Sequence, residues 1–489
     1  MNSSPTHAAV DYLTEITPLP PAEDYPVSRV QTGHWVMHHY TKDKRHFNTW
    51  ITERIPFFDP VVARATLETV IRRHDLLRTT YTYRDGAPRQ VIHPFEDFAD
   101  AIQFSREDAD SATVMARLER EAYNYAFDPI AGPMFYVKMV ETSEEVVFIF
   151  NIDHSIGDEQ SKASLRNEIF TLYRAYLQGE ENPLSPPRVQ YRDFVRWHRA
   201  LIAERTTQQF REYWYRYTVQ QLPAATLSTW AGRPVATERY TDLMERQLRE
   251  FLKPMPAEHE ALVYGSLAKL QFLEARAYCF VIPSDLHRGL RRLAKEEGTS
   301  LYNVLSLGFH LLVYRLTGCD DSVLGVNMPM RNNEDLLSMV GFLINTVLVR
   351  NRVRPEASLR ENLSATVADN LDTAELAFYP LEYLLRDFDL PFPAISHIFI
   401  NMINKEESEK QRIKDFGARH LDNKVWMNYF DLDFHIAEQK NGIEIVCEYV
   451  AEIFSPTQIE QIHATLVEVL SMLAFRTEEP LAEVFHSHS

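Results

Sequence analysis

The sequence predicts an α+β protein built from two lobes. Its 489 residues exceed one ordinary domain, and a content of 45% hydrophobic and 12% aromatic residues can fill a sizeable core. Helical and strand periodicities alternate in both halves, on either side of a proline-rich break at residues 181–188. We therefore expect an N-terminal lobe of residues 1–185 and a C-terminal lobe of residues 186–489, each mixing helices and strands.

In the first half, prolines at positions 18, 20, 21 and 26 predict an extended lead-in. The apolar period then falls from helical to two around Asp85-Gly86, which predicts a hairpin after a helix. The expected elements are a helix over 61–77, the hairpin, a helix over 111–127, strands over 133–140 and 145–152, and a helix over 161–179.

The second half repeats this mixed order after a long helical stretch that could bridge the lobes. The expected elements are that helix over 190–217, strands over 277–283, 321–329, 344–353, 396–403, 427–439 and 442–454, helices over 285–298 and 301–318, and a closing helix from Pro456.

Composition excludes several classes of function. A net charge of −18 argues against a nucleic-acid partner and against an anionic membrane surface. The three cysteines form no CxxC pair, so neither a disulfide framework nor a metal site is expected, and a reducing compartment fits. The N-terminus lacks the features of a secretory signal, and no apolar run reaches the roughly 18 residues of a membrane helix. We expect a cytoplasmic protein.

The segment 146–161 carries the chemistry that the sequence suggests. An apolar strand ends there in a cluster of polar residues, and a helix follows. A neutral histidine such as His154 could accept a proton from an incoming nucleophile. Asp158, four residues on, could hold the turn in shape by pairing with an arginine.

Another segment matches the letters of such a motif more fully. His38-His39, followed by Asp43, satisfies HHxxxD. It ends an apparent helix and has no strand before it, so we interpret it as a chance match.

Further segments, in order along the chain, resemble signature regions of the condensation domains of non-ribosomal peptide synthetases, which belong to the chloramphenicol-acetyltransferase-like group. Asp153–Ser161 takes the place of the catalytic HHxxxDGxS. The other matching segments are Ser28–Gln31 with Trp35, Arg73–Tyr81, Tyr191–Trp197, Val340–Thr346 continuing to Arg350, Tyr379–Glu382 and a weak trace at Arg386–Asp387.

This resemblance implies two acetyltransferase-like lobes in a V-shaped pseudo-dimer with a central tunnel. A carrier protein would present an acyl donor on its phosphopantetheine arm, and the acceptor would enter from the other face. His154 would contact the attacking amine or hydroxyl, as a base or as an orienting group. Asp158 would pair with an arginine, for which Arg276 is the first candidate and Arg331 the rival.

The resemblance also implies residues near the tunnel. Asn345 and Thr346 would lie close to it. Ser306 could face it as well, although a helix serine bonded to its own backbone is the preferred reading. Within the motif, Gly157 and Ser161 would flank the catalytic pair.

Two motif positions depart from the family pattern: Asp153 stands for the first histidine and Glu159 for a glycine. Asp153, Asp158 and Ser161 also fit the DxxxxDxxS of the heterocyclization branch, but that branch generally lacks a histidine like His154. Glu159 could narrow the donor channel, bind a cationic acceptor or turn to solvent.

The expected function is therefore that of a stand-alone, monomeric condensation enzyme in non-ribosomal peptide or polyketide biosynthesis. It would transfer an acyl group from a carrier protein, met in trans, to a small-molecule or carrier-bound amine or hydroxyl. The product would be an amide or an ester, the latter including release of a finished chain, and no cofactor would be bound permanently. The alternatives are a catalytically degenerate carrier-docking or recruitment module and a heterocyclization enzyme. Docking to an acidic carrier would depend on a local basic or apolar patch.

Overall fold

A computed structural model of the chain divides into two compact units. The first contains the residues up to Glu204 together with Pro329–Ile344, and most of the second is Ala268–Met328 and Asn345–Ser489. The expected contiguous lobes, 1–185 and 186–489, differ from these units, because residues 186–204 and a later segment pack with the first unit. The structure describes residues 15–40, 48–56, 58–205, 214, 223, 225–232, 256, 275–331, 333–375, 377–381, 397–403, 419–425 and 430–486.

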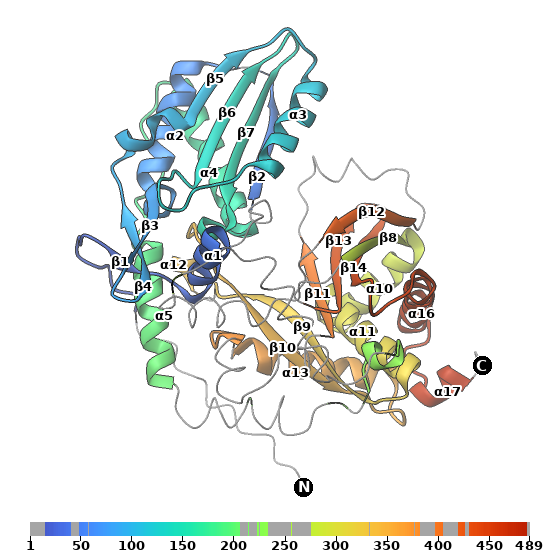
Figure 1. Ribbon diagram of the computed structural model, residues 1–489. Helices are drawn as coiled ribbons and strands as arrows, with labels where there is room; N and C mark the ends of the chain where they lie inside the picture. Colours follow the sequence, from blue (N-terminus) through green and yellow to red (C-terminus); the bar gives the residue numbers. More distant parts are fainter. Residues whose placement is uncertain are drawn as a thin grey trace. The chain divides into compact units, whose positions relative to one another are not determined.

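The first unit is built on a four-stranded sheet of order β2-β7-β6-β5 (Figure 1). Helices α2 and α4 pack together on one face of the sheet, and α3 covers the other (Figure 1). Every residue of β7 is consequently buried, which explains the apolar run from Val146 to Phe150. The elements are β2 (Asn48–Ile55), α2 (Pro60–Arg73), β5 (Ile102–Arg106), α3 (Ser111–Asn124), β6 (Phe135–Glu141), β7 (Val146–Asp153) and α4 (Glu159–Leu177).

A second, three-stranded sheet in this unit contains the expected hairpin. Its turn residues Asp85 and Gly86 both have positive φ, of 53° and 76°, as a two-residue turn between twisted strands requires. The prediction of a hairpin here is confirmed. The remaining elements of the unit are β1 (Tyr25–Pro26), α1 (Arg29–Tyr40), η2 (Asp75–Arg78), β3 (Thr79–Arg84), β4 (Ala87–Ile92), η3 (Phe95–Ala101), η4 (His154–Ile156), α5 (Tyr191–Arg205) and α12 (Glu334–Leu337).

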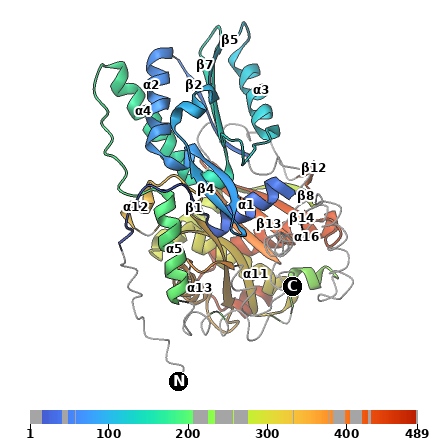
Figure 2. The ribbon, with the colours of Figure 1, turned by 60° about the vertical axis from the view of Figure 1, so that its left-hand side comes forward.

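The second unit is built on a seven-stranded sheet of order β10-β9-β11-β13-β14-β8-β12. Its core contains apolar residues of the sheet and of helices α10, α11 and α16; Figure 2 labels α11 and α16 together with strands β13 and β14. The elements are α7 (Leu227–Trp230), β8 (Ala275–Pro283), α10 (Ser284–Glu296), α11 (Leu301–Thr317), β9 (Asp321–Pro329), β10 (Ile344–Arg352), α13 (Leu359–Glu375), β11 (Ile398–Ile403), β12 (Arg419–Val425), β13 (Leu432–Gln439), β14 (Gly442–Val450), α16 (Pro456–Phe475) and α17 (Leu481–His486).

These elements confirm the α+β prediction. Helix α11 shows why the boundaries could be foreseen: Ser300 caps its first turn, and Gly318 ends it in the left-handed conformation with φ of 72°. Several elements were not predicted, among them strands β2, β5 and β12 and helix α13. Of the expected helix over 190–217, the structure describes α5 and one later residue, Trp214. No helix in the described part of the chain is long and apolar enough to cross a bilayer.

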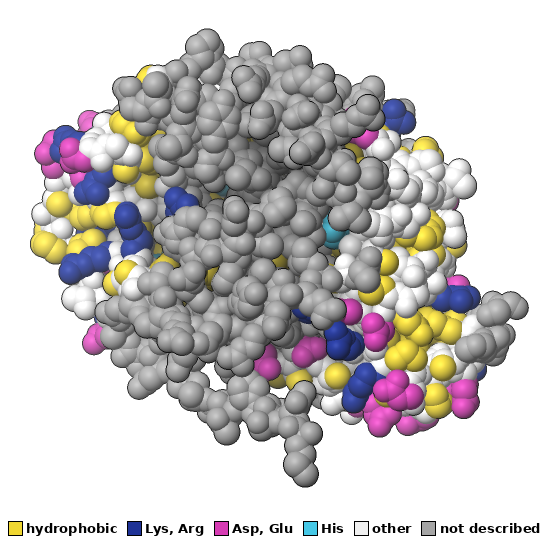
Figure 3. All heavy atoms as spheres, turned by 60° about the horizontal axis from the view of Figure 1, so that its bottom comes forward, with side chains coloured by type: hydrophobic (Ala, Val, Ile, Leu, Met, Phe, Trp, Pro, Cys, Tyr) yellow, Lys and Arg dark blue, Asp and Glu magenta, His cyan; other side chains and the backbone are white. Residues whose placement is uncertain are grey.

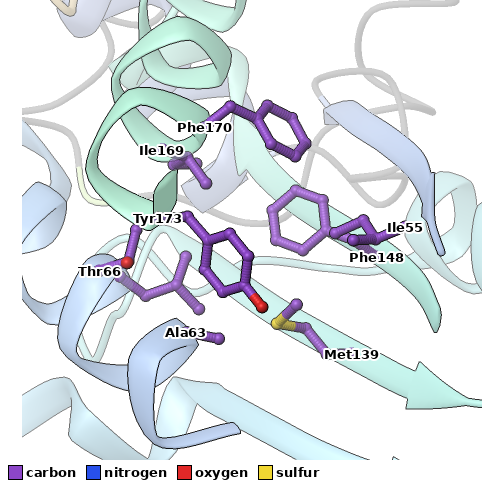
Figure 4. A pocket seen from close by; sticks show the side chains of 9 residues that line it. Ile55, Ala63, Thr66, Met139, Phe148, Ile169, Phe170 and Tyr173 are labelled. Carbon is purple, nitrogen blue, oxygen red and sulfur yellow. The ribbon is translucent and has the colours of Figure 1, made fainter. Parts of the chain in front are cut away.

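A cavity of about 20 Å³ lies between α2, α4 and the sheet of the first unit (Figure 4). Apolar side chains such as Phe148, Ile169 and Met139 make up most of its lining. None of the lining residues belongs to the segment 153–161, so this cavity is a packing defect of the core and not part of the candidate site.

Candidate active site

His154 lies at the point where β7 gives way to a turn before α4. Its Nδ1 is 2.7 Å from the carbonyl oxygen of Gly157. A carbonyl oxygen can only accept, so Nδ1 carries a proton, and in the neutral ring Nε2 is then the acceptor. The residue is half-buried. A neutral imidazole with an open Nε2 is what a general base requires.

Two other rings lie close to this imidazole. The ring centroid of Phe342 is 4.9 Å from that of His154, and the centroid of His34 on α1 is 6.1 Å away. The ring of His154 therefore has neighbours from two distant parts of the chain. Among the described residues, no group of three or more His, Cys, Asp or Glu side chains could hold a metal ion.

Asp158 is fully buried, and both of its carboxylate oxygens are occupied. Oδ1 and Oδ2 lie 2.7 and 2.9 Å from Nη2 of Arg331. The backbone N–H of Ser161 donates to Oδ1 at 2.8 Å, and that of Leu343 donates to Oδ2 at 3.0 Å. With these donors in place, Asp158 supports the site and has no oxygen left for a substrate.

The arginine partner of Asp158 is thus Arg331 and not Arg276, our first candidate. Arg276 lies on β8 of the second unit, whereas Arg331 belongs to the segment that packs with the first unit. The guanidinium of Arg331 also donates to the carbonyl oxygens of Leu336 at 2.6 Å and Met339 at 2.8 Å. It therefore joins the motif to the whole segment 336–341.

Ser161 completes the start of α4. Asp158 is the N-cap of this helix, and the two residues form a capping box. The Ser161 hydroxyl also lies 2.8 Å from the carbonyl oxygen of Gly341 and accepts from the N–H of Gly341 at 3.0 Å. The hydroxyl of Ser161 therefore hydrogen-bonds the start of α4 to Gly341, in the segment that follows Arg331. This explains why the motif ends in a small residue with a hydroxyl group.

Asp153 points into the protein and is fully buried. Its Oδ1 accepts from the backbone N–H of Ser155 at 2.8 Å, and its Oδ2 lies 2.5 Å from Nε2 of His38. Burial alone would raise the pKa of Asp153, but the charge and the hydrogen bond of His38 outweigh it and lower the pKa to about 2. We set aside His38 as part of a chance match. The HHxxxD match that begins at His38 is not the motif around His154. The side chain of His38 nevertheless contacts that motif at Asp153.

Glu159 and Gly157 have different surroundings. The side chain of Glu159 is 40% exposed, and its carboxylate pairs with Lys162 at 2.8 Å. Of the three roles considered for Glu159, the orientation towards solvent agrees with the structure. Gly157 is buried, and a Cβ at this position would come within 2.6 Å of the Cδ1 of Ile152. Glycine thus permits the close approach of the turn to β7.

The signature segments that contain Ser28, Tyr81 and Tyr191 support the same turn through hydrogen bonds. The hydroxyl of Tyr191 donates to the carbonyl oxygen of Phe342 at 2.9 Å and accepts from Ser28. The amide of Gln31 donates to the hydroxyl of Tyr81 at 3.1 Å, and that hydroxyl lies 3.4 Å from Oγ of Ser155. Burial raises the pKa of both tyrosines, which keeps them protonated donors.

Asn345, Thr346 and Ser306 belong to the second unit. The amide of Asn345 donates to the carbonyl oxygens of Ala377 and Tyr379, at 2.6 and 2.8 Å, and Thr346 donates to Asn327 at 3.2 Å. Ser306 is fully buried on α11, and its hydroxyl has no hydrogen-bond partner in the described part of the chain, in contrast to the expected bond to its own backbone. That these residues approach a tunnel stays a prediction. Glu382, Arg386 and Asp387 lie outside the described residues.

Gly341 offers a test of how tightly this region is packed. A Cβ at Gly341 would lie 2.1 Å from a carbon of the Tyr191 ring, which is held by hydrogen bonds and cannot move aside freely. We expect Gly341→Ala to lower the free energy of unfolding by about 1–3 kcal/mol or more, because it overpacks the core. Urea denaturation measures this change.

Gly33 provides the matched control. It lies within α1, and nothing approaches its Cβ position within 4 Å. Gly33→Ala should therefore be neutral or stabilising by up to about 1 kcal/mol, through the lower backbone entropy of the unfolded chain. Equal effects of the two substitutions would show that the contact between Gly341 and Tyr191 is not tight.

Comparison with known proteins places this geometry in context. A family model described as "Condensation domain" matches residues 22–487. Gramicidin S synthase 2 of Aneurinibacillus migulanus is 23% identical over 481 residues, which are 96% of this chain and 10% of that protein. Chondramide synthase of Chondromyces crocatus is 25% identical over 465 residues, 93% of this chain and 11% of that protein. The chain thus spans about a tenth of the length of these relatives.

Solved structures show the same fold at low sequence identity. A condensation domain described as mediating chain release from the enacyloxin polyketide synthase matches with a TM-score of 0.70 and 17% identity, over 95% of this chain and 85% of that one. The X-domain from teicoplanin biosynthesis matches with a TM-score of 0.67 and 18% identity, over 96% of this chain and 99% of that one.

Proposed function

Because the chain belongs to the condensation-domain family, we propose that it transfers an acyl group from a carrier-bound thioester to an amine or hydroxyl acceptor. The observation that carries this proposal is the state of His154. Its Nδ1 donates to the carbonyl oxygen of Gly157, which makes Nε2 the acceptor of the neutral ring, and the residue is half-buried. The ion pair of Asp158 with Arg331, at 2.7 Å in the same motif, supports the proposal.

In the proposed reaction, Nε2 of His154 accepts the proton of the acceptor N–H or O–H as the nitrogen or oxygen attacks the thioester carbonyl carbon. The new C–N or C–O bond forms, the C–S bond breaks, and the proton passes to the departing thiolate sulfur. The thiol stays on the phosphopantetheine arm of the carrier. A thioester is already activated, so positioning and one proton path suffice, and the residues of the chain supply both.

Carrier proteins, met in trans, are the proposed partners. Despite the net charge of −18, the described part of the face in Figure 3 shows Lys and Arg side chains among acidic and apolar ones. Local basic patches for an acidic partner are therefore compatible with the acidic balance.

The acceptor decides between two products. An amide is our first proposal. An ester that releases a finished chain is the second, favoured by the similarity to the enacyloxin domain, whose structure is described as one of chain release.

The alternatives make different predictions. A docking module is suggested by the similarity to the X-domain, which is described in a complex with OxyB. The intact support of His154 favours an enzyme instead. Heterocyclization would need Asp153 at the substrate, and its carboxylate is buried and occupied by two donors.

A single assay separates these functions. The protein is incubated with an acyl-loaded carrier and a panel of amines and alcohols, and the carrier and the products are followed by intact mass. We expect loss of the acyl group from the carrier, which regains its free thiol, and a product in which the acyl group replaces one hydrogen of the acceptor. A carrier whose acyl group is attached through a stable amide is the control, because it binds in the same way and cannot transfer. Binding without transfer over the whole panel would contradict the enzyme proposal, and a product lighter by a further water would indicate cyclization.

A further inference from the structure

We propose that His38 and Asp153 form a buried positioning pair that sets the direction of the His154 imidazole. The catalytic part of this inference rests on the proposed function. Neither residue would touch the substrate, because both side chains are 0% exposed. Their effect would reach the reaction through the turn that carries His154.

The geometry of the pair connects two elements. His38 lies in the last turn of α1, and Asp153 is the last residue of β7. One carboxylate oxygen of Asp153 contacts Nε2 of His38 at 2.5 Å, and the other accepts the N–H of Ser155 at 2.8 Å. The carboxylate of Asp153 thus connects helix α1 to the turn that carries His154, because Asp153 precedes His154 and Ser155 follows it.

This connection acts on His154 from two directions. The residue lies between Asp153 and Ser155, so the bond from Ser155 to Asp153 shapes the backbone from which the imidazole projects. Helix α1 also carries His34, whose ring lies edge-on to that of His154 with centroids 6.1 Å apart. Loosening α1 would therefore disturb both the backbone of His154 and one wall beside its ring. A displacement of about 1 Å can cost a factor of about 10² in rate.

The charges agree with a pair that is always formed near neutral pH. With a pKa of about 2, Asp153 is ionised, and a buried carboxylate needs a donor such as His38. The titratable groups around it are His34 and His38 on α1, Tyr81 on β3, and His154 in the turn. Tyr81 stays protonated, because burial raises its pKa.

Asp153→Asn tests the pair, because it keeps the shape of the side chain and removes its charge. We expect kcat to fall by about 10- to 100-fold with KM within about twofold of the wild-type value, since the direction of the base changes and the binding surface does not. His38→Gln keeps a neutral donor with similar reach and should lose less than about tenfold. His39→Gln is the matched control: its ring stacks on Trp35 at 5.0 Å, and kcat should stay unchanged.

Two readouts do not depend on the acyl-transfer assay. Nitrogen-15 NMR of the side chains should show His154 of the wild-type protein as the Nδ1–H tautomer, and Asp153→Asn should shift these signals towards a mixture of tautomers. The lowered pKa also implies that the stability contributed by Asp153 is complete above its ordinary pKa, near 3.8, and is lost as the pH falls towards 2. The Tm advantage of the wild-type protein over Asp153→Asn should therefore disappear over that interval.

A wild-type kcat in Asp153→Asn together with unchanged His154 signals would overturn this inference. If the wild-type protein itself transferred no acyl group, the proposed function would fail. The NMR signals and the pH dependence of Tm would then still decide whether the pair positions His154. If Asp153→Asn does not fold, His38→Gln carries the same measurements.

Discussion

Replacing His154 with alanine is expected to lower the turnover of acyl transfer by about 10²- to 10⁴-fold, the usual contribution of a general base. The reason is the state of its two nitrogens. Nδ1 donates to Gly157 at 2.7 Å, and Nε2 is the atom that can take the proton of the acceptor. The loss should appear mainly in kcat, because the thioester and the acceptor would still bind. Intact-mass analysis of product formation under saturating substrate measures it.

The fold should survive this substitution, because His154 is half-buried and its own hydrogen bond is local. Tm should therefore stay within a few degrees of the wild-type value. His287→Ala is a suitable control. His287 lies on α10 of the second unit, where its Nε2 is 2.7 Å from a carboxylate oxygen of Glu438, and the variant should keep its turnover. Product formation at the wild-type rate in His154→Ala would show that the base lies elsewhere.

Replacing Arg331 with alanine is expected to lower the free energy of unfolding by about 3–5 kcal/mol, the usual cost of removing one partner of a buried ion pair. The side chain of Arg331 is 4% exposed and that of Asp158 is 1% exposed, so the remaining carboxylate would be buried without its cation. The carbonyl oxygens of Leu336 and Met339 would lose their donor as well. Chemical denaturation with a tyrosine or tryptophan signal measures the change.

A second variant and a control make this prediction specific. Asp158→Asn should also lower the free energy of unfolding, because it leaves the guanidinium of Arg331 buried without a negative partner, and activity should fall with stability in both variants. Arg188→Ala removes an arginine from an exposed pair with Asp335 and should leave the unfolding transition where it is. A stable but inactive Arg331→Ala would contradict a supporting role and point to a chemical one.

The local structure of this protein could be read from its sequence, because short-range physics decides it. Hydrophobic periodicity located the helix α11 and the strand β7, and Asp85-Gly86 marked the hairpin. The change from a buried strand to a polar turn and a helix placed His154 where the structure has it. Each of these signals lies within a few residues of the feature that it predicts.

The partners of the motif were decided only by the tertiary structure. Asp158 pairs with Arg331 across 173 positions, Asp153 with His38 across 115, and Ser161 with Gly341 across 180. The sequence favoured Arg276 over Arg331 as the partner of Asp158, and His38 belonged to a segment interpreted as a chance match. A side chain at the end of a strand meets whatever the packing of other elements brings to it. Neither periodicity nor spacing records which distant residue that will be.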